Sequence, residues 1–279
     1  MKINFKILLI SALVLLTTGH SIAQVENFGS RSSLGFMVGG SYYIGDLNQY
    51  KHFNNTNLSA GLIYRYHVNS RIELRGAVRY GKVEGYDSES DRPDNLARNL
   101  SFESDIFEMS GGLEFNYLNY KMGNKQYFFT PYMFIDIGLF KMNPKTEYNG
   151  ELVELQPIGT EGQNSDLSDI KAYRLTQIVI PFGVGFKINL GERAALSLEY
   201  GIRKTFTDYL DDVGKGDYLN RTQLAEQNGS IAANLSDRSP VDIEMTGSRG
   251  NAETKDWYSM FGVMFTFSLG KPGNCHYQK

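Results

Sequence analysis

Residues 177–190 read QIVIPFGVGFKINL, and every second residue from Ile178 to Leu190 is apolar. Side chains of a β-strand point alternately to its two faces, so this segment predicts a strand with one fully apolar face. The same period of two returns between Trp257 and Leu269, where most odd-numbered residues are aromatic or aliphatic. A chain built from such segments belongs to the all-β class.

Segments with this alternation recur along the whole chain. We predict strands at residues 34–44, 57–68, 71–84, 102–120, 126–142, 173–190, 193–206 and 255–269. The connections between them are alternately short (69–70, 121–125 and 191–192) and long (45–56, 85–101, 143–172 and 207–254). This pattern predicts an eight-stranded antiparallel transmembrane β-barrel with short periplasmic turns and long extracellular loops.

The face opposite to the apolar one is rich in charged residues. Its predicted members are Arg65, Glu73, Arg75, Arg79, Glu108, Glu114, Asp136, Lys187, Glu199 and Arg203. Buried charges are tolerated when they are paired, and eight strands enclose room for side chains but not for an aqueous channel. We therefore predict a luminal charge network and no porin activity. A soluble ligand carrier of eight strands would need the reverse pattern, apolar inside and polar outside.

The N-terminus has the features of a cleavable secretory signal. Lys2 and Lys6 precede an apolar run at residues 7–16, which is too short to cross a bilayer, and small residues precede Gln24. Export then places the protein in the outer membrane of a Gram-negative-type bacterium. The expected organisation is a signal peptide at 1–23, a periplasmic N-terminal segment at 24–33, an outer-membrane β-barrel at 34–270 and a C-terminal tail at 271–279.

The composition is consistent with this class of protein. The mean hydropathy of −0.34 is low because only alternate residues of a barrel strand meet lipid. Cys275 is the only cysteine, so no internal disulfide supports the fold. Removal of the two lysines of the signal takes the formal charge from −3 to −5, which gives no basis for nucleic-acid binding.

Residues with catalytic or metal-binding potential are few. The chain has no H-E-x-x-H, G-x-S-x-G or G-x-x-x-x-G-K-[ST] motif, so we predict no catalytic, cofactor-binding or metal site and no enzyme. Asp208, Asp211 and Asp212 could offer oxygens to calcium, but the EF-hand spacing is missing, and we expect an acidic loop entrance in water. Lys82, Arg92 and Arg98 near the long loops are candidates for contact with lipid phosphates.

The long loop at 143–172 is unusually apolar for a solvent-exposed connection. Its apolar residues are Leu152, Val153, Leu155, Pro157 and Ile158. Two interpretations remain open: the loop folds over the barrel mouth as a cap, or it forms a docking surface for a protein partner. The loop at 207–254 is also too long for a simple connection.

Several segments resemble a known family. They are SYYIGDLN (41–48), RNLSF (98–102), TPY (130–132), LQPIGTEG (155–162), IPFGVG (180–185) and TFTDYLDDV (205–213). Together they resemble the outer-membrane β-barrel family that includes PorG, over about residues 34–269. In that family, PorG is the component of the type IX secretion system that ties a periplasmic ring of lipoprotein and partner subunits to the outer membrane. The resemblance implies a structural, non-enzymatic protein, and it carries over no catalytic or ligand residues.

Three functions follow as hypotheses. The first is a structural barrel that anchors or scaffolds a type IX secretion assembly, with outer-membrane lipids and periplasmic ring subunits as partners. The second is a surface adhesion or defence barrel that acts through its long loops. The third is a lipid-modifying barrel enzyme, for which His52 and a loop serine are the candidate catalytic residues.

Overall fold

The computed structural model describes residues 31–240 and 245–270. The expected signal peptide, most of the segment 24–33, and the C-terminal tail with Cys275 lie outside the described residues. The eight barrel strands are β1 (Ser32–Ile44), β2 (Asn57–His67), β3 (Ile72–Tyr86), β4 (Ser101–Asn116), β5 (Phe129–Lys141), β8 (Thr176–Asn189), β9 (Ala194–Thr205) and β10 (Trp257–Ser268). The predicted strand ends lie within a few residues of these bounds.

The strands form one closed antiparallel barrel. Their order is β3-β2-β1-β10-β9-β8-β5-β4, and pairing of β3 with β4 closes the ring, from Ile72 opposite Phe115 to Tyr86 opposite Ser101. The predicted fold class, an eight-stranded antiparallel barrel of the outer-membrane type, is therefore confirmed.

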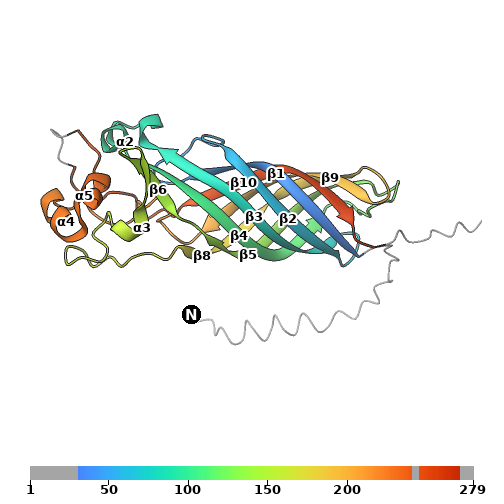
Figure 1. The fold of residues 1–279 in the computed structure, drawn as a ribbon. Helices are drawn as coiled ribbons and strands as arrows, with labels where there is room; N and C mark the ends of the chain where they lie inside the picture. Colours follow the sequence, from blue (N-terminus) through green and yellow to red (C-terminus); the bar gives the residue numbers. More distant parts are fainter. Residues whose placement is uncertain (1–30, 241–244, 271–279) are drawn as a thin grey trace, which may run out of the picture.

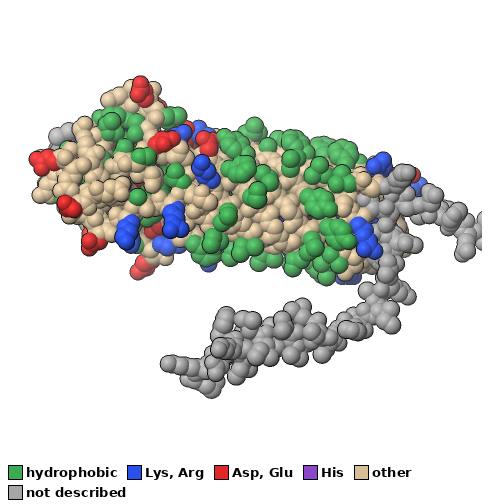
Figure 2. All heavy atoms as spheres, turned by 60° about the horizontal axis from the view of Figure 1, so that its bottom comes forward, with side chains coloured by type: hydrophobic (Ala, Val, Ile, Leu, Met, Phe, Trp, Pro, Cys, Tyr) green, Lys and Arg blue, Asp and Glu red, His purple; other side chains and the backbone are tan. Residues whose placement is uncertain are grey.

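The outer face of the barrel is an apolar belt. Ile137, Val184 and Phe267 are 67%, 55% and 57% exposed, and their neighbours in sequence point inward. Figure 2 shows hydrophobic side chains along the barrel, with Lys and Arg side chains where the barrel meets the cap and at the opposite end. Such a surface would aggregate in water and is suited to lipid. None of the helices in the described ranges is long and apolar enough to cross a membrane.

Glycines inside the barrel make room for large luminal side chains. A Cβ atom on Gly201 would lie 2.7 Å from the Phe134 ring and 2.8 Å from Nη1 of Arg203. A Cβ on Gly112 would lie 2.6 Å from Oδ1 of Asp136. The lumen is therefore filled by long charged and aromatic side chains that need small neighbours.

The long loops form a folded cap at one end of the barrel, opposite the short turns (Figure 1). The cap contains a hairpin of β6 (Pro144–Tyr148) and β7 (Glu151–Glu154), which extends the sheet because Glu103 of β4 pairs with Lys145. Its helical segments are η1 (Asp87–Glu89), α2 (Pro93–Arg98), α3 (Leu155–Ile158), α4 (Arg221–Asn228) and α5 (Ser230–Ser236). The strand prediction left residues 143–172 as a loop and missed this hairpin.

Candidate functional site

Arg75 lies at the centre of the lumen and joins three carboxylates. Its Nη1 atom lies 3.1 Å from Oε2 of Glu114 and 3.0 Å from Oε2 of Glu199. Its Nη2 atom donates to Oε1 of Glu199 at 3.0 Å, and its Nε atom lies 3.4 Å from Oδ2 of Asp136. The guanidinium carbon lies 4.0 Å from the centre of the Phe134 ring. This residue therefore has both charged and aromatic partners on three other strands, β4, β5 and β9.

The charge network extends from Arg75 toward the cap. Arg79 Nη1 and Arg203 Nε lie 2.8 and 3.2 Å from the Glu108 carboxylate. The Tyr258 hydroxyl donates to the same carboxylate at 2.9 Å, and Arg79 Nη2 lies 3.2 Å from Glu199. One carboxylate thus links strands β3, β4, β9 and β10.

The network also extends toward the short turns. Lys187 Nζ lies 2.8 Å from Oε2 of Glu73 and contacts Glu114 as well. Arg65 Nε donates to Oε2 of Glu114 at 2.9 Å, and His67 Nδ1 lies 3.1 Å from Oε1 of Glu73. The ion pairs therefore form a connected chain along the length of the barrel.

The structure places all ten residues of the predicted network inside the barrel, where none is more than 4% exposed. Each has an oppositely charged partner within 4.0 Å. A luminal cavity near the short turns, lined in part by Arg65, His67 and Lys187, has a volume of only about 10 Å³. That is the space of about one water molecule. The described lumen offers no path for a solute.

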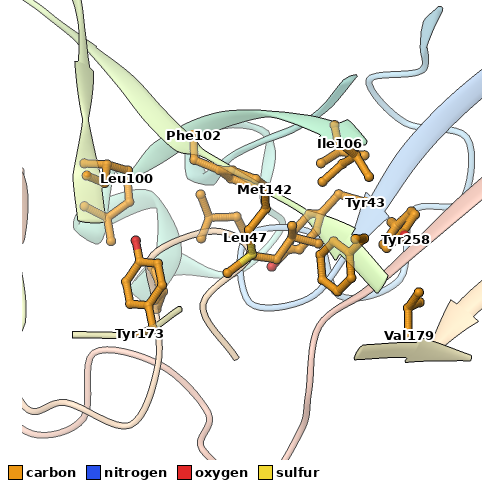
Figure 3. Close-up of a cluster of buried hydrophobic side chains, with 14 of the residues drawn as sticks. Tyr43, Leu47, Leu100, Phe102, Ile106, Met142, Tyr173, Val179 and Tyr258 are labelled. Atoms are coloured by element: carbon orange, nitrogen blue, oxygen red, sulfur yellow. The ribbon is translucent and has the colours of Figure 1, made fainter. Parts of the chain in front are cut away.

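The mouth of the barrel is filled by apolar side chains (Figure 3). Tyr43, Phe102 and Val179 come from strands and pack with residues of the long loops such as Leu47 and Tyr173. The Tyr43 and Phe102 rings meet edge to face, with centroids 4.8 Å apart. This cluster joins the cap to the barrel as one hydrophobic core.

Two buried arginines hold the cap loops together. Arg249 donates through Nη1 to the carbonyl oxygen of Asp212 at 2.6 Å and to Oγ1 of Thr160 at 3.0 Å. Arg98 donates to the carbonyl oxygen of Arg249 at 2.7 Å and binds the Asp87 carboxylate through two bonds of 2.7 Å. Three long loops therefore share one buried polar core.

The acidic segment after β9 is part of this core and is not a solvated loop entrance. Asp208, Asp211 and Asp212 are 5%, 2% and 0% exposed. Asp211 accepts from the Tyr43 hydroxyl at 2.5 Å, and Asp212 accepts from Tyr173 at 2.7 Å. The expectation of water around these residues was wrong, because the loops fold over them.

The electrostatics of this segment follow from burial. Burial raises the pKa of Asp212 to about 6, although Arg249 opposes the shift. Burial also raises the pKa of Asp208 to about 6, against the effect of Lys255, and raises the pKa of Asp211 well above its usual range. Among the described residues, no cluster of three or more His, Cys, Asp or Glu side chains is arranged to hold a metal ion.

The apolar residues of loop 143–172 divide between two faces of the cap. Leu155 is 4% exposed in the mouth cluster, and Val153 and Ile158 pack against that cluster while partly buried. Leu152 is 57% exposed, and Pro157 is also exposed. The loop therefore covers the mouth with one face and presents Leu152 and Pro157 to the outside.

Sequence reasoning missed two residues that organise the cap. Glu161 is 1% exposed and accepts from the backbone N–H groups of Gly214 and Gly216 at 2.8 and 3.1 Å. Arg249 lies in a polar segment without any distinguishing pattern. The signal available for Glu161 was its place in the LQPIGTEG motif, whose Thr160 contacts Asp212 of the TFTDYLDDV motif.

The candidate lipid-contact and catalytic residues make contacts within the protein. Arg98 is 6% exposed and paired with Asp87, so it does not face lipid. Lys82 pairs with Glu103 at 2.8 Å, and Arg92 donates to Oε1 of Gln49 at 3.1 Å. His52 Nδ1 lies 3.1 Å from the hydroxyl of Tyr42 on the outer side of β1.

Comparison with known proteins gives a family and several similar barrels. The sequence model of a family described as Domain of unknown function (DUF6089) matches residues 6–228. No curated protein matches the chain.

Three solved outer-membrane structures resemble it at low identity. Neisserial surface protein A is 9% identical, with 86% of this chain and 98% of that chain covered and a TM-score of 0.42. The outer membrane protein OprG of Pseudomonas aeruginosa is 11% identical, with 86% and 99% covered and a TM-score of 0.41. The attachment invasion locus protein Ail of Yersinia pestis is 13% identical, with 85% and 99% covered and a TM-score of 0.38.

Proposed function

This chain belongs to the DUF6089 family, and we propose that it is a non-enzymatic scaffold of the outer membrane that anchors a type IX secretion assembly. The scaffold role is supported by the architecture of the barrel. The assignment to type IX secretion is supported by the resemblance of its motifs to the family that includes PorG. These two supports are independent of each other.

The observation that carries the scaffold role is the filled interior. Paired charges occupy the lumen, and the apolar cluster of Tyr43, Phe102 and their neighbours fills the mouth. A barrel closed in this way does not conduct solutes, so its function must depend on its outer surfaces. A rigid support for other proteins uses such surfaces without a catalytic group.

Four of the six motifs behind the resemblance contribute residues to the cap core or the mouth cluster. Tyr43 of SYYIGDLN contacts Asp211 of TFTDYLDDV, and Thr160 of LQPIGTEG contacts Asp212 of the same motif. Leu100 of RNLSF lies in the mouth cluster with Leu155. These motifs therefore contribute to the closed end of this barrel, which supports a structural role.

The usual orientation of such barrels puts the long loops outside the cell and the short turns in the periplasm. A periplasmic ring would then contact the turn at 121–125 or the flanking segments 24–33 and 271–279, most of which lie outside the described residues. These contact sites are part of the proposal.

The test combines affinity purification with site-specific crosslinking. The tagged protein is recovered from detergent-solubilised outer membranes, with a photo-crosslinker at Lys125 in one strain and at Leu152 in another. Crosslinks to periplasmic ring subunits from Lys125 but not from Leu152 support the anchor. Recovery of the barrel alone, from a strain that contains the secretion machinery, would refute it.

A surface adhesion or defence role is the second candidate, and the outward face of the cap favours it. Leu152 is exposed on the β6–β7 hairpin, and this hairpin is held by Lys145–Glu154 pairing and by the cap core behind it. A preformed apolar contact costs little entropy on binding. Loss of the protein should then impair attachment or serum survival while export by the type IX system continues.

A lipid-modifying activity has weaker support. His52 contacts Tyr42, and a catalytic histidine would need a nucleophile within hydrogen-bond reach. Lipid A mass spectra from a deletion strain should match those of the parent strain. A changed spectrum, restored by the wild-type gene and not by His52→Ala, would instead establish the enzyme.

A further inference from the structure

The apolar belt ends in a lysine on three strands that run toward the cap. Within β3, β5 and β9 the last exposed or half-buried apolar residues facing lipid are Tyr80, Leu139 and Ile202, and Phe206, just after β9, is also exposed. The next outward-facing positions hold Lys82, Lys141 and Lys204. The cap-side edge of the belt therefore carries cations at the level where lipid chains give way to headgroups.

The cap-side edge has an acidic sector and a basic sector. In the acidic sector, over β3 and β4, Lys82 pairs with Glu103 at 2.8 Å, and the Tyr80 hydroxyl donates to Asp105 at 2.6 Å. Glu84 lies 4.0 Å from the same lysine. In this sector Lys82 is already paired, and the carboxylates outnumber the cation.

The basic sector consists of Lys141, Arg174 and Lys204, over β5, β8 and β9. All three are exposed, and among the described residues none has a carboxylate within 4.0 Å. Lys141 is opposite Thr176 in the ladder, two residues after Arg174, so these two cations are neighbours. Within the described residues, no carboxylate therefore competes with an external anion for these cations.

Apolar groups surround the basic sector. Lys204 is opposite Ile180 on one side and Trp257 on the other, and its Nζ atom lies 5.6 Å from the Trp257 ring. Leu139 and Ile178, next to Lys141 on the outer face, are 54% and 52% exposed. A partner for this surface must therefore combine an anionic group with apolar chains.

We propose that the basic sector binds the phosphate group of an anionic lipid, whose acyl chains lie along β5, β8 and β9 of the apolar belt. Lysine and arginine form charge-assisted hydrogen bonds with phosphate oxygens, and cations beside a membrane attract anionic lipids. A free phosphate ion would use the cations alone. A lipid uses both the cations and the exposed aliphatic side chains beneath them.

Trp257 provides a direct readout, because it is the only tryptophan of the chain and contacts Lys204. The mature protein is folded into phosphatidylcholine bilayers, and phosphatidic acid with brominated acyl chains is titrated in. Brominated phosphatidylcholine is titrated in parallel, and quenching of the Trp257 fluorescence gives the relative affinity. We expect phosphatidic acid to be preferred by about 10-fold or more, since each basic residue contributes about fivefold near anionic lipid.

The variants separate the basic sector from general surface charge. The triple variant Lys141→Gln, Arg174→Gln, Lys204→Gln should lose the preference, whereas Lys82→Gln, whose parent ammonium is already paired, should keep it. Lys141→Arg with Lys204→Arg should also keep it. A wild-type protein without preference, a triple variant that retains it, or an equal loss in Lys82→Gln would overturn the proposal.

A competition experiment distinguishes lipid from free anion. Inorganic phosphate at the concentration of the lipid should leave the quenching unchanged, because it lacks acyl chains. Displacement at equal concentration would show a simple anion site and overturn the assignment to lipid. Correct folding of each variant is checked by the gel mobility of the unheated barrel.

Discussion

The lumen of the barrel and the core of the cap are both built from buried charged side chains, but they differ in charge balance. The lumen, as far as the structure describes it, holds five Lys or Arg side chains and five carboxylates. The described cap buries the carboxylates Asp46, Asp87, Glu161, Asp208, Asp211, Asp212, Asp237 and Asp256, with Arg98 and Arg249 as buried cations. The cap therefore carries an excess of buried acid.

The two regions stabilise their carboxylates by different means. In the lumen, strands held in fixed register place each carboxylate beside a cation, as with Arg75 and Glu199. In the cap, most carboxylates accept hydrogen bonds from hydroxyl and backbone N–H groups. The Tyr43 hydroxyl, for example, lies 2.5 Å from Asp211 and 3.1 Å from Asp256. Burial raises the pKa of Asp256 well above its usual range. We infer that the stability of the cap is sensitive to moderate pH changes.

The largest expected effect is in the lumen. Arg75→Leu leaves Glu114, Asp136 and Glu199 without their shared cation, so we expect the free energy of unfolding to fall by about 3 to 5 kcal/mol. Denaturant unfolding in lipid bilayers measures this change, with the exposed Lys125→Leu as the control. Equal stabilities of the two variants would show that the lumen does not depend on charge pairing.

Arginine substitutions in the apolar belt should have the next largest effect on stability. Their cost in folding free energy should depend on the depth of the residue in the membrane. Val184 lies midway along the outer face of β8, whereas Ile180 is opposite Lys204 at the cap-side edge. Val184→Arg should cost about 2 to 4 kcal/mol of folding free energy, and Ile180→Arg about 0 to 1. The same unfolding assay compares the two variants. A larger cost at Ile180 would place the membrane at a different level on the barrel.

The cap should lose stability as the pH rises. The pKa of Asp212 is about 6 in the folded protein and close to 3.8 in the unfolded chain, so folding favours the protonated form. Its stabilising contribution is complete below about pH 4 and is lost as the pH rises through 6, by up to about 3 kcal/mol. Hydrogen exchange, corrected for intrinsic rates, should show less protection of residues 207–216 at pH 8 than at pH 5.

The matched variant for this effect is Asp212→Asn, which keeps the side-chain shape and removes the titrating group. It should reduce the pH dependence in the cap and leave the exchange of β4 unchanged. Protection that rises with pH in the wild-type cap would contradict the charge comparison.

The sequence predicted the barrel well because a strand's alternation is local information. The inward position of Lys187 and the outward position of Phe186 follow from their order in one strand. The alternation of short and long connections then predicts that consecutive strands pair in antiparallel fashion. The residues of this regular part could therefore be placed before the structure was known.

The cap could not be predicted in the same way, because its contacts join distant parts of the chain. Arg98 donates to the carbonyl oxygen of Arg249, and Thr160 donates to Asp212. Nothing local in the sequence indicates that Asp212 is buried, since an acidic segment usually faces water. The apolar residues of loop 143–172 signalled a buried face but did not say which of them would form it.

Leu152 and Leu155 separate the two interpretations of that loop, and Leu152 gives the smallest expected effect on stability. Leu152 is 57% exposed, so Leu152→Ser should change the free energy of unfolding by less than about 0.5 kcal/mol. Leu155 is 4% exposed in the mouth cluster, and Leu155→Ala should cost about 2 to 5 kcal/mol of cap stability.

Hydrogen exchange of the cap measures the stability of both variants, and recovery of co-purifying proteins measures docking. If the outward face binds a partner, Leu152→Ser lowers recovery while exchange stays at the wild-type level. If recovery is unchanged in Leu152→Ser and falls only when Leu155→Ala loosens the cap, the loop acts as a cap and this face is not the docking surface.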